Sequence, residues 1–323
     1  MKACCAIAAA GLLALAAQQA FAADGYPSKA IRLVVISAPG GTTDVLARVI
    51  AQHMTESFGQ PVVTDNRPGG GGIIASEITA KSNPDGYTLL YAHTAYSVLP
   101  SLHRKLNYHP VRDFAPVSLT ALFPNLLIAN NALPARSAND LIALARAQPG
   151  KLNYAAGTTG GTAHLAGELL KSMAGVDIVH VPYKGTGAQL TAVISGESHV
   201  TFATLPAALP HVKAGRVRAL AVAAARRSPA LPDLPTVSES ALPGFDVSAW
   251  NGILAPRGTP RATVDRLNRE LHRIVAIPDV RERALVQGAE LIANSPEQFA
   301  SHIKAEIAKW AGVVKFAGIR LEQ

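Results

Sequence analysis

Short apolar runs alternate along the chain with longer stretches of helical periodicity. Runs of 4–8 apolar or β-branched residues, followed by turn residues, are typical of buried strands, whereas apolar positions spaced three and four apart are typical of helices. Strands are predicted at residues 31–36, 61–64, 87–91, 152–155, 178–181, 200–203 and 217–222. Helices are predicted from Thr42 onward and at residues 73–80, 137–148, 164–174, 186–195, 207–214, 260–275, 278–287 and 296–317. This alternation predicts an α/β protein.

A glycine-rich loop joins the first strand to the first helix. Pro39, Gly40 and Gly41 form the turn, and Thr42, Thr43 and Asp44 open the helix. The first N–H groups of a helix lack internal acceptors and carry the positive end of its dipole, so glycines that allow close approach make such a loop suitable for an anion. The alternative is a turn in which glycine only changes the direction of the chain. Residues 157–164, GTTGGTAH, repeat the pattern in the second half of the sequence.

The first 22 residues have the features of a secretory signal peptide. Lys2 gives a basic start, residues 6–17 are almost wholly apolar but too short to span a bilayer, and residues 20–22, AFA, form a small-x-small cleavage site. We therefore expect export to the periplasm and cleavage near Ala22. Cys4 and Cys5 are the two cysteines of the chain, so the mature protein is expected to have no disulfide, thiolate metal site or cysteine nucleophile.

Composition limits the class of protein. Hydrophobic residues make up 49% and charged residues 16% of the 323 residues, which fits a folded α/β protein with more than one core. The formal net charge is +8, but the basic residues are scattered and have no aromatic residues between them, so we expect no nucleic-acid partner.

No enzyme or metal motif is present in the sequence. The glycine run 69–72 lacks the lysine and hydroxyl residue of a phosphate-binding P-loop, and no serine lies in a nucleophile-elbow pattern. The ten histidines include no pair with metal-ligand spacing on a helix. We therefore expect no catalytic residues, no metal and no cofactor.

Seven segments in order resemble the periplasmic solute-binding proteins of tripartite tricarboxylate transporters, the Bug family, over essentially the whole mature chain. They are APGGTTD (38–44), NRPGGGG (66–72), DGYTLL (85–90), QPGKLNY (148–154), HVPYKGT (180–186), GRVRALAV (215–222) and LPDLPTV (231–237). The resemblance implies a type II periplasmic-binding fold of two α/β lobes with the ligand cleft between them. With residues 1–22 as signal peptide, it places residues 23–124 and 223–323 in lobe 1 and residues 125–222 in lobe 2, joined by two crossing segments.

The resemblance also implies the ligand-binding residues, because family members hold a carboxylate with backbone amides, hydroxyls and water at strand ends. In lobe 1 these are Ser37, Ala38, Gly40, Gly41, Thr42, Thr43, Asp44, Thr94 and Ala95. In lobe 2 they are Gly157, Thr159, Gly160, Gly161, Thr162, His164 and Thr204. Family members more often have an aromatic residue or a proline at positions 37 and 38, so the cleft is expected to be wider or more polar at Ser37 and Ala38.

Four side chains have two interpretations. His164 either donates to a ligand oxygen or caps and packs the start of its helix. Asp44 either contacts the ligand directly or braces the loop by accepting backbone N–H bonds, and we expect bracing, because a carboxylate at a helix start would repel an anionic ligand. Tyr183 and Trp250 either line the cleft or pack beside it.

The function predicted from this resemblance is capture of a small organic carboxylate for the membrane subunits of a tripartite tricarboxylate-type transporter, by a monomer. The alternatives are a ligand-binding component of a membrane sensor and a small-molecule hydrolase or lyase. Neither glycine loop contains Arg or Lys, so neutral donors are expected to hold the anion, with Arg67 and Lys184 as the nearest candidate cations.

Overall fold

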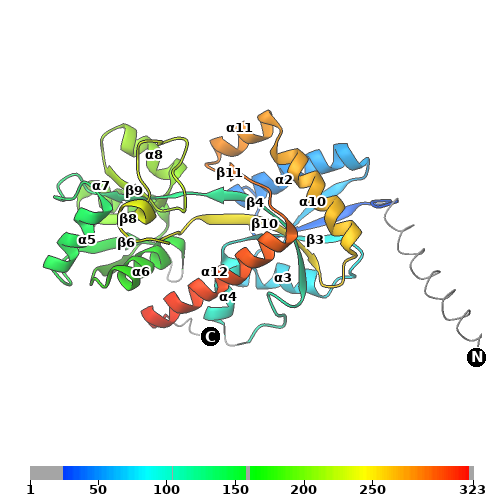
Figure 1. The fold of residues 1–323 in the computed structure, drawn as a ribbon, viewed down its shortest axis with the longest axis horizontal. Helices are drawn as coiled ribbons and strands as arrows, with labels where there is room; N and C mark the ends of the chain where they lie inside the picture. Colours follow the sequence, from blue (N-terminus) through cyan, green and yellow to red (C-terminus); the bar gives the residue numbers. More distant parts are fainter. Residues whose placement is uncertain (1–24, 104, 158–160, 320–323) are drawn as a thin grey trace, which may run out of the picture.

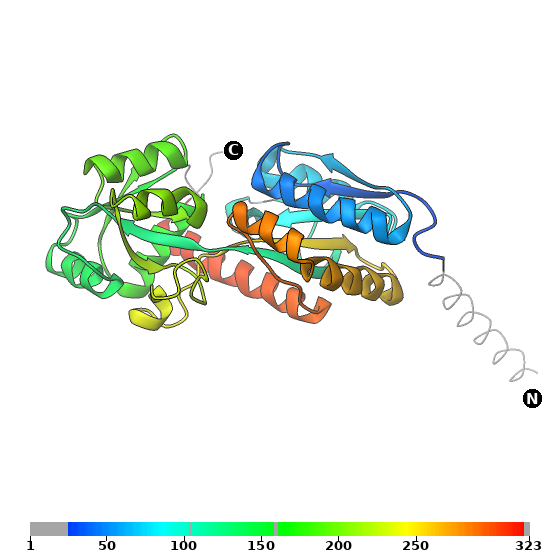
Figure 2. The same cartoon turned by 90° about the horizontal axis from the view of Figure 1, so that it is seen from above.

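The computed structural model describes residues 25–103, 105–157 and 161–319. The predicted signal peptide lies outside these residues, as do Thr159 and Gly160 of the second glycine loop. The described chain forms two α/β lobes, each built on one sheet with helices on both faces (Figure 1, Figure 2). This is the two-lobe α/β fold predicted from the sequence.

The first sheet has six strands, which come from two parts of the chain, residues 31–123 and 249–291. Its spatial order is β11 (Glu290–Leu291), β4 (Phe114–Phe123), β10 (Ala249–Pro256), β3 (Thr88–His93), β1 (Ile31–Val35) and β2 (Val62–Asn66). Strand β1 is parallel to β2 and β3, whereas β10 runs antiparallel to β3 and β4. The carboxyl ends of β1 and β3 therefore lie at the same edge of the sheet as the start of β10.

The second sheet has five strands formed by the middle of the chain. Its order is β7 (Val179–Pro182), β6 (Asn153–Ala156), β8 (Val200–Thr204), β5 (Asn125–Ala129) and β9 (Arg218–Val222). Strand β6 is parallel to β7 and β8, and β5 is antiparallel to β8 and β9. The chain enters this sheet at Pro124, between β4 and β5, and leaves it after β9.

Helices cover both sheets. They are α2 (Thr42–Phe58), α3 (Ile73–Ala80) after a short 3₁₀ turn (Gly70–Gly72), α4 (Ala95–Leu102), α5 (Ala138–Ala147), α6 (Thr162–Ala174), α7 (Thr186–Ser195), α8 (Leu205–Lys213), α9 (Val237–Ser240), α10 (Arg261–Val275), α11 (Pro278–Val286) and α12 (Pro296–Ala317). In the described part of the chain, no helix combines the length and apolarity that a membrane span requires.

Helix α12 contributes to the cores of both lobes. Near its start, Phe299 and Ile303 pack with residues of the first sheet. Near its end, Trp310 and Val313 belong to the cluster that contains buried residues of the second sheet. Figure 1 shows this helix running from the first lobe to a position below the second. The lobe boundaries at residues 125 and 222 therefore remain a prediction, and α12 crosses the division that they imply.

Two elements were missed because of proline. Strand β4 passes through Pro116, which has no N–H for a ladder, and a register shift in the pairing with β10 falls between Pro116 and Ser118. The β11 strand pairs only with Ala121 and Leu122, so Pro116 does not interrupt that ladder. Helix α4 contains Pro100, and its buried face, which includes Val98, favours a helix in spite of it.

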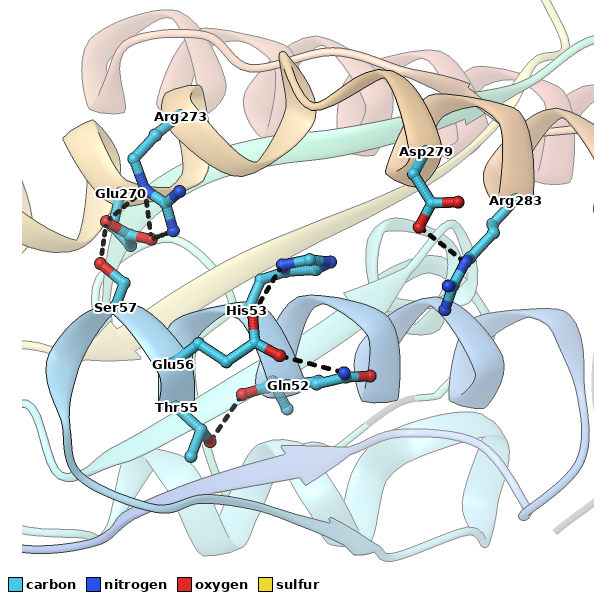
Figure 3. Close-up of polar contacts among 10 residues, drawn as sticks. Gln52, His53, Thr55, Glu56, Ser57, Glu270, Arg273, Asp279 and Arg283 are labelled. Carbon is cyan, nitrogen blue, oxygen red and sulfur yellow. Dashed lines mark hydrogen bonds and ion pairs between the residues drawn. The ribbon is translucent and has the colours of Figure 1, made fainter.

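Polar side chains hold α2 against α10 beside the first sheet. Ser57 donates to Glu270 Oε2 at 2.8 Å, and Arg273 Nη2 pairs with Glu270 Oε1 at 2.6 Å (Figure 3). Glu270 is only 8% exposed, so these partners satisfy a buried charge. These bonds hold the C-terminal end of α2, and the N-terminal end of the same helix follows the first glycine loop.

Candidate functional site

A cavity of about 410 Å³ is lined by residues of both lobes. Its polar lining comes mainly from threonines at strand ends and helix starts, and its apolar lining from residues of α4, α6, α12, β4 and β10. The lining residues are Thr42, Thr43, His93, Thr94, Ala95, Val98, Phe123, Gly161, Thr162, Leu165, Thr204, Ala249, Trp250, Asn251 and Trp310.

Four helices begin at this cavity. Helix α2 starts at Thr42, α4 follows Thr94, α6 starts at Thr162 and α8 follows Thr204, so each lobe supplies two. None of the four has a hydrogen bond from the side chain of its N-cap residue to its first turn. Each helix start carries about half a positive charge, so the cavity is electropositive without a cationic side chain in its described lining.

Strand β10 fixes the direction of two threonine hydroxyls. The backbone N–H of Trp250 donates to Thr94 Oγ1 at 2.8 Å, and Asn251 Nδ2 donates to Thr43 Oγ1 at 3.3 Å. A hydroxyl oxygen that accepts a hydrogen bond keeps its own proton for another acceptor. Thr43 and Thr94 are therefore set to donate, which is the role that a carboxylate oxygen requires.

The orientation of the Asn251 amide is determined by its surroundings. Its Nδ2 also lies 3.2 Å from the carbonyl oxygens of Ala92 and Trp250, which can only accept. A flipped amide would place Oδ1 against these two oxygens and lose both bonds. The two hydrogens of Nδ2 serve three acceptors, so the bond to Thr43, the longest of the three, is a shared, three-centre bond.

His93 is a neutral group in the cavity lining. Burial lowers its pKa to about 4, and its Nδ1 accepts the backbone N–H of Ala95 at 3.1 Å. The proton of the neutral ring therefore lies on Nε2. The backbone N–H of Ala95 is already used, so Ala95 lies in the cavity but does not offer this donor to a ligand.

Asp44 braces the first glycine loop. Its Oδ2 accepts the backbone N–H of Gly40 at 2.9 Å and Arg48 Nε at 3.0 Å, and its Oδ1 accepts Asn66 Nδ2 at 2.8 Å. Burial opposes ionisation of this carboxyl, but the hydrogen bonds from Arg48, Gly40 and Asn66 outweigh it and hold its pKa below the ordinary value. The expected bracing bond from the loop backbone is present, and the negative charge is balanced by Arg48.

The cavity brings together part of the predicted set. The predicted residues in its lining are Thr42, Thr43, Thr94, Ala95, Gly161, Thr162 and Thr204. The described residues outside it are Ser37, Ala38, Gly40, Gly41, Asp44, Gly157 and His164. Ser37 uses its carbonyl oxygen to accept Asn66 Nδ2 at 3.0 Å. Ser37 and Ala38 are not among the residues that line this cavity, and the expectation of a wider or more polar wall at these positions stays a prediction.

His164 lies behind the start of α6. Its ring stacks on His180 at 4.1 Å between centroids and on Tyr154 at 6.5 Å, and the residue is 6% exposed. Burial lowers the pKa values of both histidines, that of His180 to about 4. These contacts pack the start of the helix, and donation by His164 to a ligand oxygen stays a prediction.

The sequence did not identify most of the apolar residues that line the cavity. Val98, Phe123, Leu165, Ala249 and Trp310 are ordinary apolar residues, and nothing in a sequence separates a cavity wall from a core position. Trp250 was left open and lines the cavity. A signal did exist for Asn251, which is a lone amide in an otherwise apolar strand and is 1% exposed.

Two α/β lobes with an electropositive cavity of neutral donors between them define a solute-binding protein. The model of the tripartite tricarboxylate transporter family receptor, TctC, matches residues 46–319, and the chain belongs to this family. BugT of Bordetella pertussis is 38% identical over 302 residues, which cover 93% of each chain.

Two solved structures are similar over nearly the whole chain. An R. palustris protein solved with adipate is 41% identical with a TM-score of 0.72, over 92% of this chain and 100% of that one. MatC from Rhodopseudomonas palustris, solved with bound malate, is 35% identical with a TM-score of 0.68, over 90% of this chain and 100% of that one.

Proposed function

We propose that this protein captures a small organic carboxylate in the cavity between its lobes, delivers it to the membrane subunits of a tripartite tricarboxylate-type transporter, and leaves it chemically unchanged. The observation that carries the proposal is the convergence of four helix starts, with Thr43 and Thr94 set as donors, on one cavity. The adipate and malate bound by its structural relatives support the same ligand chemistry.

Neutral donors are sufficient for one carboxylate in a dry cleft. A hydrogen bond to a charged group contributes about 1.5–3 kcal/mol, and a helix start adds up to about 1 kcal/mol. The ligand-binding set that we propose is Thr42, Thr43, Thr94, Gly161, Thr162 and Thr204, extended by His93 and Asn251. Gly41 belongs with it as the N-cap residue of α2.

The proposed function also requires export of the protein to the periplasm. Structural relatives include the periplasmic binding protein BugD, and the N-terminal segment has the sequence features of a signal peptide. We propose cleavage near Ala22 and a periplasmic mature protein. Intact-mass measurement of protein recovered from the periplasm tests this, since retention of residues 1–22 contradicts it.

Calorimetry with mature protein tests the ligand class. Adipate and malate are the first probes, and the matched control is adipamide, which keeps the shape of adipate without its charge. We expect heat of binding with at least one acid and none with the amide. Equal affinity for adipate and adipamide contradicts a carboxylate site, and turnover of the bound acid seen by mass spectrometry contradicts a binding-only role.

The alternative function, as the ligand-binding component of a membrane sensor, uses the same cavity but requires a sensor protein as partner in place of transporter subunits. Affinity purification of cross-linked, acid-loaded protein from its own membranes separates the two. Recovery of multi-spanning permease subunits supports transport, whereas recovery of a histidine kinase supports a sensor.

A further inference from the structure

The walls between the helix starts are apolar. Val98 comes from α4, Trp310 from α12, Phe123 from the end of β4, Ala249 from the start of β10 and Leu165 from the first turn of α6. Apart from Ala249, each of these side chains is at most 9% exposed. The polar groups are therefore confined to strand ends and helix starts, and the space between them is bounded by hydrocarbon and aromatic rings.

The described lining contains no side chain with a formal charge. It has no Lys, Arg, Asp or Glu, and His93 is neutral because burial lowers its pKa to about 4. The helix starts and threonine hydroxyls can replace the water of a carboxylate at either end. A carboxylate or hydroxyl group in the part of the ligand that lies against Phe123, Leu165 and Trp310 would lose its water with no polar partner from these three side chains, which is strongly unfavourable.

We infer that the ligand is an organic acid with one or two terminal carboxylates and an apolar body, and that compact tricarboxylates such as citrate are rejected. This inference rests on the proposed function, because it assigns the rest of a ligand whose carboxylate that proposal places at the helix starts. Burial of the body against Leu165, Phe123 and Trp310 adds affinity to that of the neutral donors.

Two homologous series of acids test the inference by calorimetry. The probes are butanoate, hexanoate and octanoate, then succinate, adipate and suberate, with citrate and tricarballylate as the competing class. Each methylene buried against the wall is expected to lower Kd about fourfold until the cavity is filled. The best acid of the two series is expected to bind at least about tenfold more tightly than either tricarboxylate.

A pair of variants tests whether the cavity wall causes the dependence of Kd on the chain length of the acid. Leu165→Ala removes a wall side chain, and Leu169→Ala removes a leucine one turn along the same helix and in the same core cluster that does not line the cavity. Both changes lower stability, but only Leu165→Ala is expected to flatten the dependence of Kd on chain length. Ala249→Ser is the second wall variant, because it changes polarity with little change in volume and keeps the test open if Leu165→Ala fails to fold.

The outcomes separate the inference from the proposed function. Tightest binding of citrate or tricarballylate, or no gain with chain length in either series, overturns the apolar-body inference and leaves the carboxylate proposal standing. A Kd weaker than about 1 mM for every acid overturns the carboxylate proposal itself. Flattening by Leu169→Ala to the same degree as by Leu165→Ala overturns the role of the cavity wall.

Discussion

The amide nitrogen of Asn251 lies 3.3 Å from the hydroxyl oxygen of Thr43, although 208 positions separate the two residues in the sequence. The contact joins the start of β10 to the first turn of α2, across the edge of the first sheet. Since Asn251 donates, the hydroxyl proton of Thr43 is available to the cavity. A residue outside the predicted site therefore sets the chemical role of one inside it.

This contact predicts coupling between the two side chains in ligand binding. Thr43→Val removes one hydrogen bond to a charged oxygen and should weaken acid binding about 10- to 150-fold. Asn251→Leu should weaken binding about 3- to 10-fold in the native background and hardly at all in the Thr43→Val background. Calorimetry on the native protein, the two single variants and the double variant measures this coupling as a double-mutant cycle.

Thr191→Val is the control for the cycle, because Thr191 is exposed on α7 and bonds only to the carbonyl of Gly187. It should leave the affinity unchanged. Additive losses in the double variant would show that Asn251 acts on the fold and not through Thr43.

Gly41→Ala should reduce affinity without reducing stability. Gly41 has φ −78°, which any residue adopts, and an added Cβ would meet only the carbonyl oxygen of Ala38 at 3.8 Å. The fold therefore accepts alanine, whereas a ligand approaching the N-cap of α2 would meet the new methyl group. Thermal unfolding should show the same Tm, and calorimetry a loss of about tenfold or more.

The matched control for Gly41→Ala is Gly312→Ala, in α12, where the new Cβ meets nothing within 4 Å. Alanine there should raise stability by about 0.5–1 kcal/mol and leave binding unchanged. Unchanged affinity in Gly41→Ala would mean that the ligand does not approach this loop closely.

Arg67→Gln and Lys184→Gln should each change affinity by less than about threefold. Arg67 Nε is held by both oxygens of Asp65, at 2.9 and 3.1 Å, and neither Arg67 nor exposed Lys184 lines the cavity. Calorimetry with the fold checked by circular dichroism decides the point. A hundredfold fall in either variant would reveal an ionic clamp and overturn the neutral-donor account.

Stability should fall on acidification before most carboxylates titrate. Burial lowers the pKa of His93 to about 4, from an unfolded value of about 6.5. Between these values the unfolded chain binds more protons than the folded chain, so the free energy of unfolding decreases as the pH falls through this window. His93 alone should contribute up to about 1.4 kcal/mol per pH unit to this slope.

Urea unfolding at several pH values between about 7 and 4.5 measures this slope. His93→Gln keeps an acceptor for the Ala95 N–H and should reduce the slope. The same slope in the native protein and in His93→Gln would contradict the neutral buried state of His93. The pair His164 and His180, whose pKa values burial also lowers, should account for part of the slope that remains.

The sequence by itself determined the local elements and the chemistry available to them. The β-branched run before Pro39, the glycines after it and the threonines at the helix starts depend on neighbours a few residues away, so strand, loop and helix could be located from pattern. Both glycine loops lack Arg and Lys, which can be read directly from the sequence, and this absence predicted neutral donors.

Only the tertiary structure decided which of these groups face one cavity and in what state. Contacts between Asn251 and Thr43, Trp250 and Thr94, and Trp310 and the second lobe join residues far apart in the chain, and no local periodicity encodes such a partner. The neutrality of His93 is likewise a result of burial, which packing sets. Long-range contacts thus brought the helix starts that follow the two predicted glycine loops to one electropositive cavity with apolar walls, because burial and hydrogen-bond direction exist only once the lobes are assembled.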